Sequence, residues 1–180
     1  MYPGSFNPPT VAHLAIAEAA AQQAGLSRVY LVISQVPLGK EGLSRPTPHE
    51  RIEVLRAVSS SRSWLEARGS DHQLLVDIAE GADAVILGGD KWAQLIDPAW
   101  YEGSTAARDD ALDRLPLMLV APRPSSPLPP GEPGRVQVLD VDPRHRPVSS
   151  SAVRAGRGAW MLPEARASGL WRKAEPDEDA

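Results

Sequence analysis

The chain has 180 residues with 23 acidic and 19 basic side chains, a net charge of -4 at pH 7. This length predicts one domain with one core, and the interspersed charges exclude a protein that binds nucleic acid or anionic membranes through its overall charge. The lack of cysteine excludes disulfides, zinc–thiolate sites and thiol nucleophiles. The sequence shows neither a transmembrane run nor a signal-peptide layout, so we expect a cytoplasmic protein.

A glycine and two prolines stand in front of the first predicted helix. Residues 4–10 read GSFNPPT, and an alanine-rich helix is expected over Val11–Ala24, with His13 on its first turn and Gly25 as its left-handed cap. A strand, glycine turn and helix in this order favour phosphate binding, because the helix N-terminus and nearby amides attract anions. Three residues precede the glycine, so we expect a shortened first strand or a chain start further upstream.

Apolar, β-branched runs alternate with helical patterns along the rest of the chain. Thr47–Glu50 and Ser70–Gln73 read as capping boxes that start two further helices. The alternation predicts an α/β fold with a doubly wound, Rossmann-like parallel sheet, helices on both faces and a single domain over residues 1–172. The acidic residues 173–180 are expected to form a disordered tail. The predicted strands after the first are Arg28–Ser34, Ala84–Gly88, Leu117–Ala121 and Arg135–Asp140.

A second hydroxyl-rich run, Ser149, Ser150 and Ser151, lies near the other end of the chain at a predicted helix start. Ser149 alone would be an ordinary N-cap. Arg154 follows Ser150 and Ser151 at helical spacing, so its guanidinium can bind the β- and γ-phosphates of a nucleotide through two nitrogens. Two phosphate sites in one domain predict a nucleoside triphosphate as ligand.

These two runs resemble the signature motifs of the nucleotidylyltransferase superfamily, (H/T)xGH and ISSTxIR. Residues 10–13 match the first motif in its Thr form, with Ala12 in place of glycine, and residues 148–154 match the second. The five resembling segments keep their order over most of residues 2–165. The three between the motifs resemble nicotinate and nicotinamide mononucleotide adenylyltransferases, and they are ILGGD at 86–90, PAW at 98–100 and LMLVAPRP at 117–124.

The resemblance implies an enzyme that transfers AMP from Mg-ATP to a phosphorylated small molecule and releases pyrophosphate. Such in-line transfer needs no covalent intermediate, so the protein supplies positioning and charge neutralisation. We expect Gly4 to admit the backbone close to phosphate, with the amides of Ser5 and Phe6 pointing at its oxygens. Thr10 and His13 are three residues apart on one helix face and are expected to donate to the reacting phosphorus. Together with the arginine of the second motif, they are the predicted catalytic residues.

Four further side chains are candidates for nucleotide or acceptor binding. Gly88 and Asp90 follow a strand at its carboxyl end, where open α/β sheets bind ligands, and Asp90 is expected to bind ribose hydroxyls or to cap a helix. Trp100 is expected to stack on a pyridine ring or to be a core aromatic. The resemblance implies that Lys40 faces the acceptor phosphate, although an ordinary solvated lysine fits equally well. Arg123 is a further candidate for a phosphate.

The lead acceptor is nicotinate or nicotinamide mononucleotide, which would place the enzyme in NAD biosynthesis. The alternatives are phosphopantetheine or a sugar or polyol phosphate as acceptor, CTP as donor, or a catalytically weak nucleotide-binding protein. Mg²⁺ is expected to bind through the ATP phosphates, and no protein metal site is predicted because the histidines lack metal-ligand spacing. We expect neither nucleic acid nor membrane as partner, and a homo-oligomer is left open.

Overall fold

The computed structural model describes residues 1–35, 46–72, 74–124 and 135–172. Its strands form two parallel three-stranded sheets, with the orders β1-β2-β3 and β4-β5-β6. The strands are β1 (Tyr2–Pro3), β2 (Val29–Ser34), β3 (Leu65–Ser70), β4 (Ala84–Gly88), β5 (Leu117–Ala121) and β6 (Val136–Val138).

The two sheets meet between β1 and β4. The nitrogen of Met1 donates to Ala84 O at 2.7 Å, and Ile86 N donates to Met1 O at 2.8 Å. In parallel sheets, a residue of one strand bonds to two residues, two positions apart, on the neighbouring strand, as Met1 does here. The strands therefore follow the order β3-β2-β1-β4-β5-β6, which reverses direction between β1 and β4. The predicted Rossmann-like α/β fold is confirmed.

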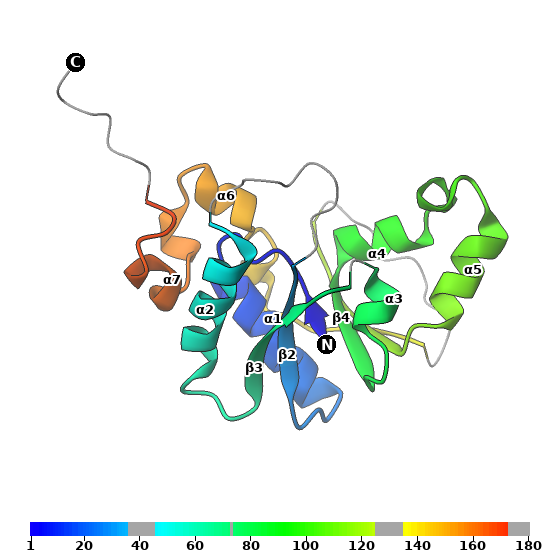
Figure 1. Cartoon of the computed structure of the whole chain (residues 1–180), viewed down its shortest axis with the longest axis horizontal. Helices are drawn as coiled ribbons and strands as arrows, with labels where there is room; N and C mark the ends of the chain where they lie inside the picture. The colour runs from blue at the N-terminus through cyan, green and yellow to red at the C-terminus, as the bar shows by residue number, and fades with distance from the viewer. Residues whose placement is uncertain (36–45, 73, 125–134, 173–180) are drawn as a thin grey trace, which may run out of the picture.

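Helices cover both faces of the strands (Figure 1). α1 (Val11–Gln23) and α2 (Pro48–Ser59) share one core cluster with Ile86 of β4, whereas the neighbouring Val85 packs with α3 (Leu75–Ile78), α4 (Gly89–Ile96) and α5 (Thr105–Asp113). Successive residues of a strand face opposite sides of a sheet, so the two clusters lie on opposite faces. The remaining elements are η1 (Pro98–Tyr101), η2 (Pro143–His145), α6 (Ser150–Arg154), η3 (Gly158–Trp160) and α7 (Pro163–Ala167).

The local signals at the first two helices are confirmed. Gly25 follows α1 with φ +63, the left-handed conformation in which glycine is favoured. At the start of α2, Glu50 N donates to Thr47 Oγ1 at 3.2 Å and Thr47 N donates to Glu50 Oε2 at 2.7 Å, which completes the predicted capping box. The first strand is short, as expected, since β1 has two residues.

The predicted capping box at Ser70–Gln73 is wrong. Ser70 is the last residue of β3, a strand that the sequence pattern did not predict, and α3 begins only after Leu74. β3 lies at the edge of the strand order, and edge strands tolerate charged and exposed side chains. The sequence of β3, LEARGS, therefore shows no apolar run, and its last residue, Ser70, resembles a helix cap.

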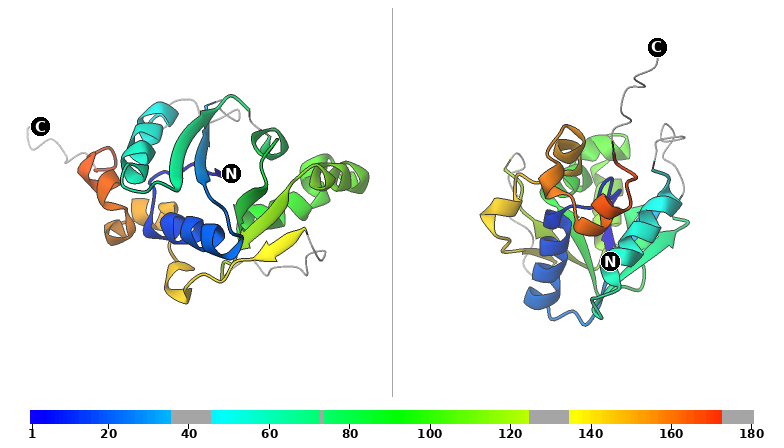
Figure 2. Two further views of the ribbon diagram at one scale, coloured as in Figure 1. Left: turned by 90° about the horizontal axis from the view of Figure 1, so that it is seen from below. Right: turned by 90° about the vertical axis from the view of Figure 1, so that its left-hand side faces the viewer.

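The C-terminal elements fold back onto the start of the chain. α7 lies beside α2 in both views of Figure 2, and the two helices are in contact. Thr10 and Met161 form an isolated antiparallel bridge. The predicted tail at residues 173–180 lies outside the described part of the chain. Among the described residues, no helix is long and apolar enough to cross a membrane.

Candidate active site

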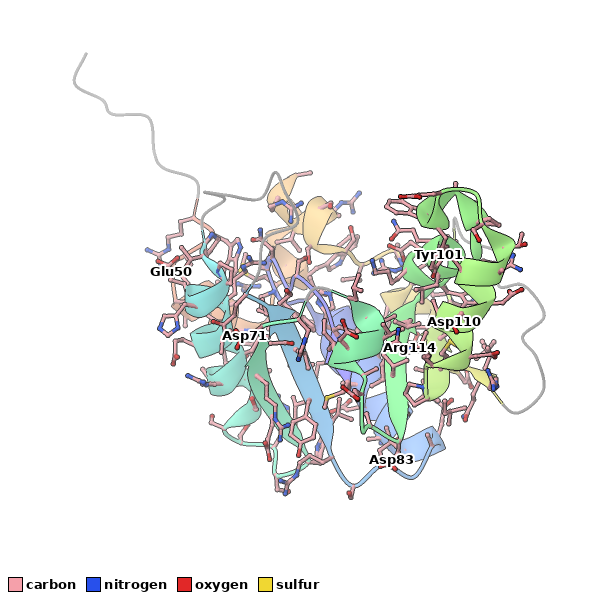
Figure 3. All side chains as sticks on the ribbon, turned by 45° about the vertical axis from the view of Figure 1, so that its right-hand side comes forward. Glu50, Asp71, Asp83, Tyr101, Asp110 and Arg114 are labelled. Atoms are coloured by element: carbon pink, nitrogen blue, oxygen red, sulfur yellow. The ribbon has the colours of Figure 1, made fainter. Side chains whose placement is uncertain are left out.

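The candidate site lies where β1 and β4 end. Gly4 follows β1 and Gly88 ends β4, so the two predicted glycines stand on the strands between which the order reverses. In open α/β sheets this switch point is the crevice in which ligands bind. Figure 3 shows Asp83, just before β4, at the lower end of the molecule and Tyr101, at the end of η1, near the upper end.

Residues 4–9, here named the glycine loop, wrap around the ring of Phe6. That ring is 1% exposed and makes edge contacts with Tyr2 at 5.5 Å and His13 at 5.0 Å between centroids. A Cβ on Gly4 would lie 3.1 Å from two atoms of the ring, which explains the glycine. Phe6 itself has φ 44, an uncommon conformation for a residue with a side chain. Its side chain therefore shapes the loop from inside, and its amide is the group left for a ligand.

The carbonyls of the glycine loop are held by donors from distant parts of the chain. Ser5 O accepts from Nη1 of the buried Arg51 at 2.6 Å, and Pro9 O accepts from Leu162 N at 3.1 Å. Pro8 O accepts from Ser150 Oγ at 2.7 Å, and Asn7 O accepts from Arg154 Nη1. The carbonyl and amide of a trans peptide point in opposite directions, so holding Ser5 O to one side turns the Phe6 amide to the other.

His13 is oriented by Thr10. The backbone amide of Thr10 donates to His13 Nδ1 at 3.0 Å, and Thr10 Oγ1 lies 2.9 Å from the same nitrogen. An amide can only donate, so Nδ1 accepts and the proton of the neutral ring lies on Nε2. Nε2 has no hydrogen-bond partner among the described residues. It is the free donor of the first motif, whereas the Thr10 side chain is fully buried at the N-cap of α1.

Burial, together with the smaller effect of the nearby positive charge of Arg123, lowers the pKa of His13 from 6.5 to about 4. The ring is therefore neutral at pH 7 in this structure. Its contribution to a ligand is one N–H bond from Nε2 rather than a fixed positive charge.

Asp90 and Arg123 form the other wall of the site. Asp90 lies in the first turn of α4, whose N-cap is Gly88, and its Oδ1 is 3.5 Å from Arg123 Nε. A Cβ on Gly88 would lie 3.0 Å from Asp90 Oδ1, so the glycine leaves room for this carboxylate. Arg123 Nη1 also donates to Val148 O at 2.9 Å, which connects β5 to the segment before α6. Because Gly88 is the N-cap of α4, Asp90 is not the cap residue of its helix. The side chain of Asp90 is 68% exposed.

The second motif reaches the glycine loop. Ser149 is the N-cap of α6, as one reading of the sequence predicted, and its Oγ accepts from Ala152 N at 3.1 Å. Ser150 and Arg154 donate to the loop carbonyls described above, and Arg154 Nη2 also donates to Ser151 Oγ at 3.3 Å. The second motif is thus in direct contact with the glycine loop, which lies about 140 residues earlier in the chain and directly precedes the first motif.

Two predicted acceptor residues, Lys40 and Trp100, remain to be placed. Lys40 lies outside the described residues. Trp100 lies in η1 and is 66% exposed, so the alternative that it is a core aromatic is wrong; Trp92, which is 5% exposed, is the core tryptophan of that region. The exposed indole of Trp100 is available to a ligand.

Sequence reasoning missed three residues of the site. Arg51 and Trp171 each hold the glycine loop, Trp171 through Nε1, which donates to Asn7 Oδ1 at 2.6 Å. Tyr2 packs against Phe6 and, at 6.2 Å between centroids, against His13. A buried arginine one turn into a helix carries no local signal for the loop that it contacts, and neither does a tryptophan 164 residues away.

The described residues contain no group of three or more His, Asp or Glu that could hold a metal ion. The candidate acid of the site, Asp90, already faces Arg123. The donors gathered here suit an anionic ligand, since they are backbone amides, an imidazole N–H, hydroxyls and guanidinium groups.

Comparisons with known proteins show the family of the chain. The cytidylyltransferase-like family model matches residues 1–156. A probable nicotinate-nucleotide adenylyltransferase from Listeria innocua is 35% identical over 63 residues, which are 35% of this chain and 34% of that protein. The chain therefore aligns with about a third of the length of this relative.

Two solved structures share the fold. The nicotinic acid mononucleotide adenylyltransferase of Plasmodium falciparum complexed with NaAD gives a TM-score of 0.66 at 13% identity, covering 94% of this chain and 95% of that chain. The same enzyme complexed with APC gives 0.62 at 13% identity, covering 94% of both chains. With the family model matching most of its length, the chain belongs to the cytidylyltransferase-like family and is a nucleotidyltransferase.

Proposed function

We propose that this nucleotidyltransferase transfers AMP from Mg-ATP to nicotinate mononucleotide or nicotinamide mononucleotide and releases pyrophosphate. An oxygen of the acceptor phosphate attacks the α-phosphorus in line, the new P–O bond forms, and the bond to the β-phosphate oxygen breaks. The electron pair of that bond leaves with pyrophosphate. The acceptor phosphate is already ionised at neutral pH, so no general base is required.

The glycine loop and His13 bind the reacting phosphate in this proposal. The amides of Ser5 and Phe6 approach its oxygens, and the free Nε2–H of His13 donates to the oxygen on which charge rearranges. Thr10 is assigned a different role from the one expected from sequence, because its hydroxyl is buried against His13 Nδ1. It positions the imidazole, and His13 makes the contact.

The second motif binds the leaving group. Arg154 is exposed and donates to Asn7 O and to Ser151 Oγ in this structure. Two neutral acceptors are weaker partners for a guanidinium than phosphate oxygens are, so an arriving triphosphate would replace them. The Ser151 hydroxyl and the N-terminus of the short α6 lie beside it and add donors, whereas the one hydroxyl proton of Ser150 is donated to Pro8 O.

The opposite wall recognises the nucleosides. Asp90 is exposed above Gly88 and is assigned to ribose hydroxyls, which donate to a carboxylate. Trp100 is assigned to the pyridine ring, with Arg123 and Lys40 toward the acceptor phosphate. Mg²⁺ comes to this site as part of Mg-ATP and is held by the phosphate oxygens, because the ion usually keeps few protein ligands.

The observation that carries the proposal is the contact of the second motif with the glycine loop that leads from the end of β1 to His13: Ser150 and Arg154 both donate to carbonyls of this loop, and Thr10 at its end orients His13. The acceptor is supported by the Listeria relative and by the exposed Trp100.

Pyrophosphate release tests the proposal directly. The full chain is assayed with ATP or CTP against a panel of nicotinate mononucleotide, nicotinamide mononucleotide, phosphopantetheine, glycerol phosphate and ribose phosphate. We expect turnover with ATP and one or both pyridine mononucleotides. Turnover with a different acceptor, or with CTP alone, would replace the substrate assignment. Tight ATP binding without turnover on any acceptor would contradict catalysis and support a nucleotide-binding protein.

A further inference from the structure

The C-terminal segment reaches His13 through a single peptide group. Leu162 N donates to Pro9 O at 3.1 Å, and the amide of the next residue, Thr10, donates to His13 Nδ1 at 3.0 Å. The carbonyl of Pro9 and the amide of Thr10 belong to the same peptide unit. A donor on the carbonyl polarises that peptide and strengthens its N–H as a donor. Leu162 and His13 therefore bond to opposite sides of one planar group.

Other contacts between the C-terminal segment and the start of the chain hold this peptide in place. Thr10 and Met161 form an antiparallel bridge, so the backbone before Leu162 runs beside the end of the glycine loop. Trp171 Nε1 donates to Asn7 Oδ1 at 2.6 Å, two residues before Pro9. The side chain of Leu162 is buried in the main core cluster, which fixes where its amide points.

We propose that the segment Met161–Trp171 is a positioning element for His13: the Leu162 amide, acting through the Pro9–Thr10 peptide, holds the imidazole with Nδ1 as acceptor and Nε2–H turned to the substrate. The segment lies beyond both motifs and touches no substrate in this assignment. The effect of this segment on turnover rests on the proposed function of His13 in catalysis. Its effect on the orientation of the His13 ring does not depend on that function.

The backbone at Leu162 permits a direct test. Its φ of -61 is the value that proline adopts, and Met161, with φ -72 and ψ 139, already has the extended conformation required before proline. Leu162→Pro therefore removes the amide donor, and its ring carbon pushes Pro9 O away. Leu162→Ala is the matched control, because it removes the same buried side chain and keeps the donor.

Nitrogen NMR of the imidazoles gives a readout that is independent of activity. The chain has four histidines, and the His13 signals are identified by their loss in His13→Gln. We expect an acceptor-type Nδ1 and a protonated Nε2 in the wild type and in Leu162→Ala at pH 7. In Leu162→Pro we expect a mixture of the two neutral tautomers. Identical tautomers in all three proteins would overturn the proposal.

Kinetics give the second readout. We expect kcat of Leu162→Pro to fall about tenfold below that of Leu162→Ala, the rate equivalent of one ordinary hydrogen bond, with little change in the KM for ATP. Equal kcat in the two variants would contradict the positioning role. If no acceptor is turned over by the wild type, the proposed function fails, while the NMR comparison still decides this inference.

Trp171→Phe provides a second test of the proposal if Leu162→Pro does not fold. It removes the donor to Asn7 Oδ1 and keeps an aromatic ring, so we expect kcat to fall about two- to tenfold. Trp160→Phe is the control, since that indole lies 5.1 Å from Arg157 Cζ and donates no hydrogen bond among the described residues. An equal effect of the two tryptophan substitutions on kcat would count against the proposal.

Discussion

The two walls of the site differ in how firmly they are held. On the side of the first sheet, the carbonyls of Ser5, Pro8 and Pro9 each accept a hydrogen bond from another part of the chain. On the side of the second sheet, Asp90 is 68% exposed and Trp100 is 66% exposed. The groups assigned to the reacting phosphate are therefore organised before any ligand binds, whereas the groups assigned to the acceptor are open.

Preorganised donors are worth most where charge changes during the reaction. An open recognition wall, in contrast, contributes mainly to binding, and its residues should affect KM more than kcat. Substitutions on the two walls should therefore have different kinetic signatures, and this difference can be tested in order of expected effect.

The largest effect is expected at His13. His13→Ala removes the free Nε2–H, and kcat should fall about a hundredfold to a thousandfold, or about 2.7–4 kcal/mol, with little change in ATP affinity. Steady-state kinetics with saturating acceptor, together with ATP titration calorimetry, separates the two quantities. Wild-type turnover in His13→Ala would refute its assignment.

Arg154 should rank second. Arg154→Ala removes a charged donor from the leaving pyrophosphate, which costs about 1.5–3 kcal/mol, and both kcat and the KM for ATP should suffer. Both residues act on one transition state, so the loss in the double variant His13→Ala/Arg154→Ala should be smaller than the sum of the single losses. Strict additivity would indicate that the residues serve separate steps.

Trp100 should give the opposite signature. Trp100→Ala is expected to raise the KM for the acceptor by the equivalent of about 1–3 kcal/mol and to leave the KM for ATP nearly unchanged. Its exposure predicts an unchanged melting temperature, whereas Trp92→Ala, at the buried tryptophan, should lower it. An unaltered acceptor KM in Trp100→Ala would remove this residue from the acceptor wall.

The smallest effect is a pH dependence of stability. The folded-state pKa of His13 lies at about 4, below its ordinary 6.5, so the unfolded chain binds more protons in between. The contribution of His13 is fully present above about pH 6.5 and is lost as the pH falls toward 4. Urea unfolding at pH 7.5 and pH 4.5 should show a smaller loss of stability for His13→Gln than for the wild type. The same loss in both proteins would show that burial of His13 does not shift its pKa.

The sequence predicted the fold well, because the fold depends on short patterns. The turn after α1 requires glycine at position 25, and the box at Thr47 and Glu50 needs only neighbours three residues apart. Edge strand β3 was not predicted because its sequence, LEARGS, contains no run of apolar or β-branched residues.

The hydrogen bonds that hold the glycine loop in place could not be predicted in the same way. Arg51, Leu162 and Trp171 act on loop residues that are distant in sequence, and any donor placed nearby by the fold could fill their roles. The change in role for Thr10 has the same origin. Its hydroxyl could face either a ligand or the histidine, and only the position of Thr10 at the N-cap of α1 turns it inward.

In the proposed reaction, the residues of the two motifs together transfer the adenylyl group of ATP, with its α-phosphate, to a pyridine mononucleotide. The most direct measurement uses ATP radiolabelled at the α-phosphate, with nicotinate mononucleotide as acceptor and His13→Ala as the paired variant. We predict that the label appears in a dinucleotide with the wild type and at least about a hundredfold more slowly with the variant. Label that stays in ATP, or that is released as free AMP without a dinucleotide, would contradict this account.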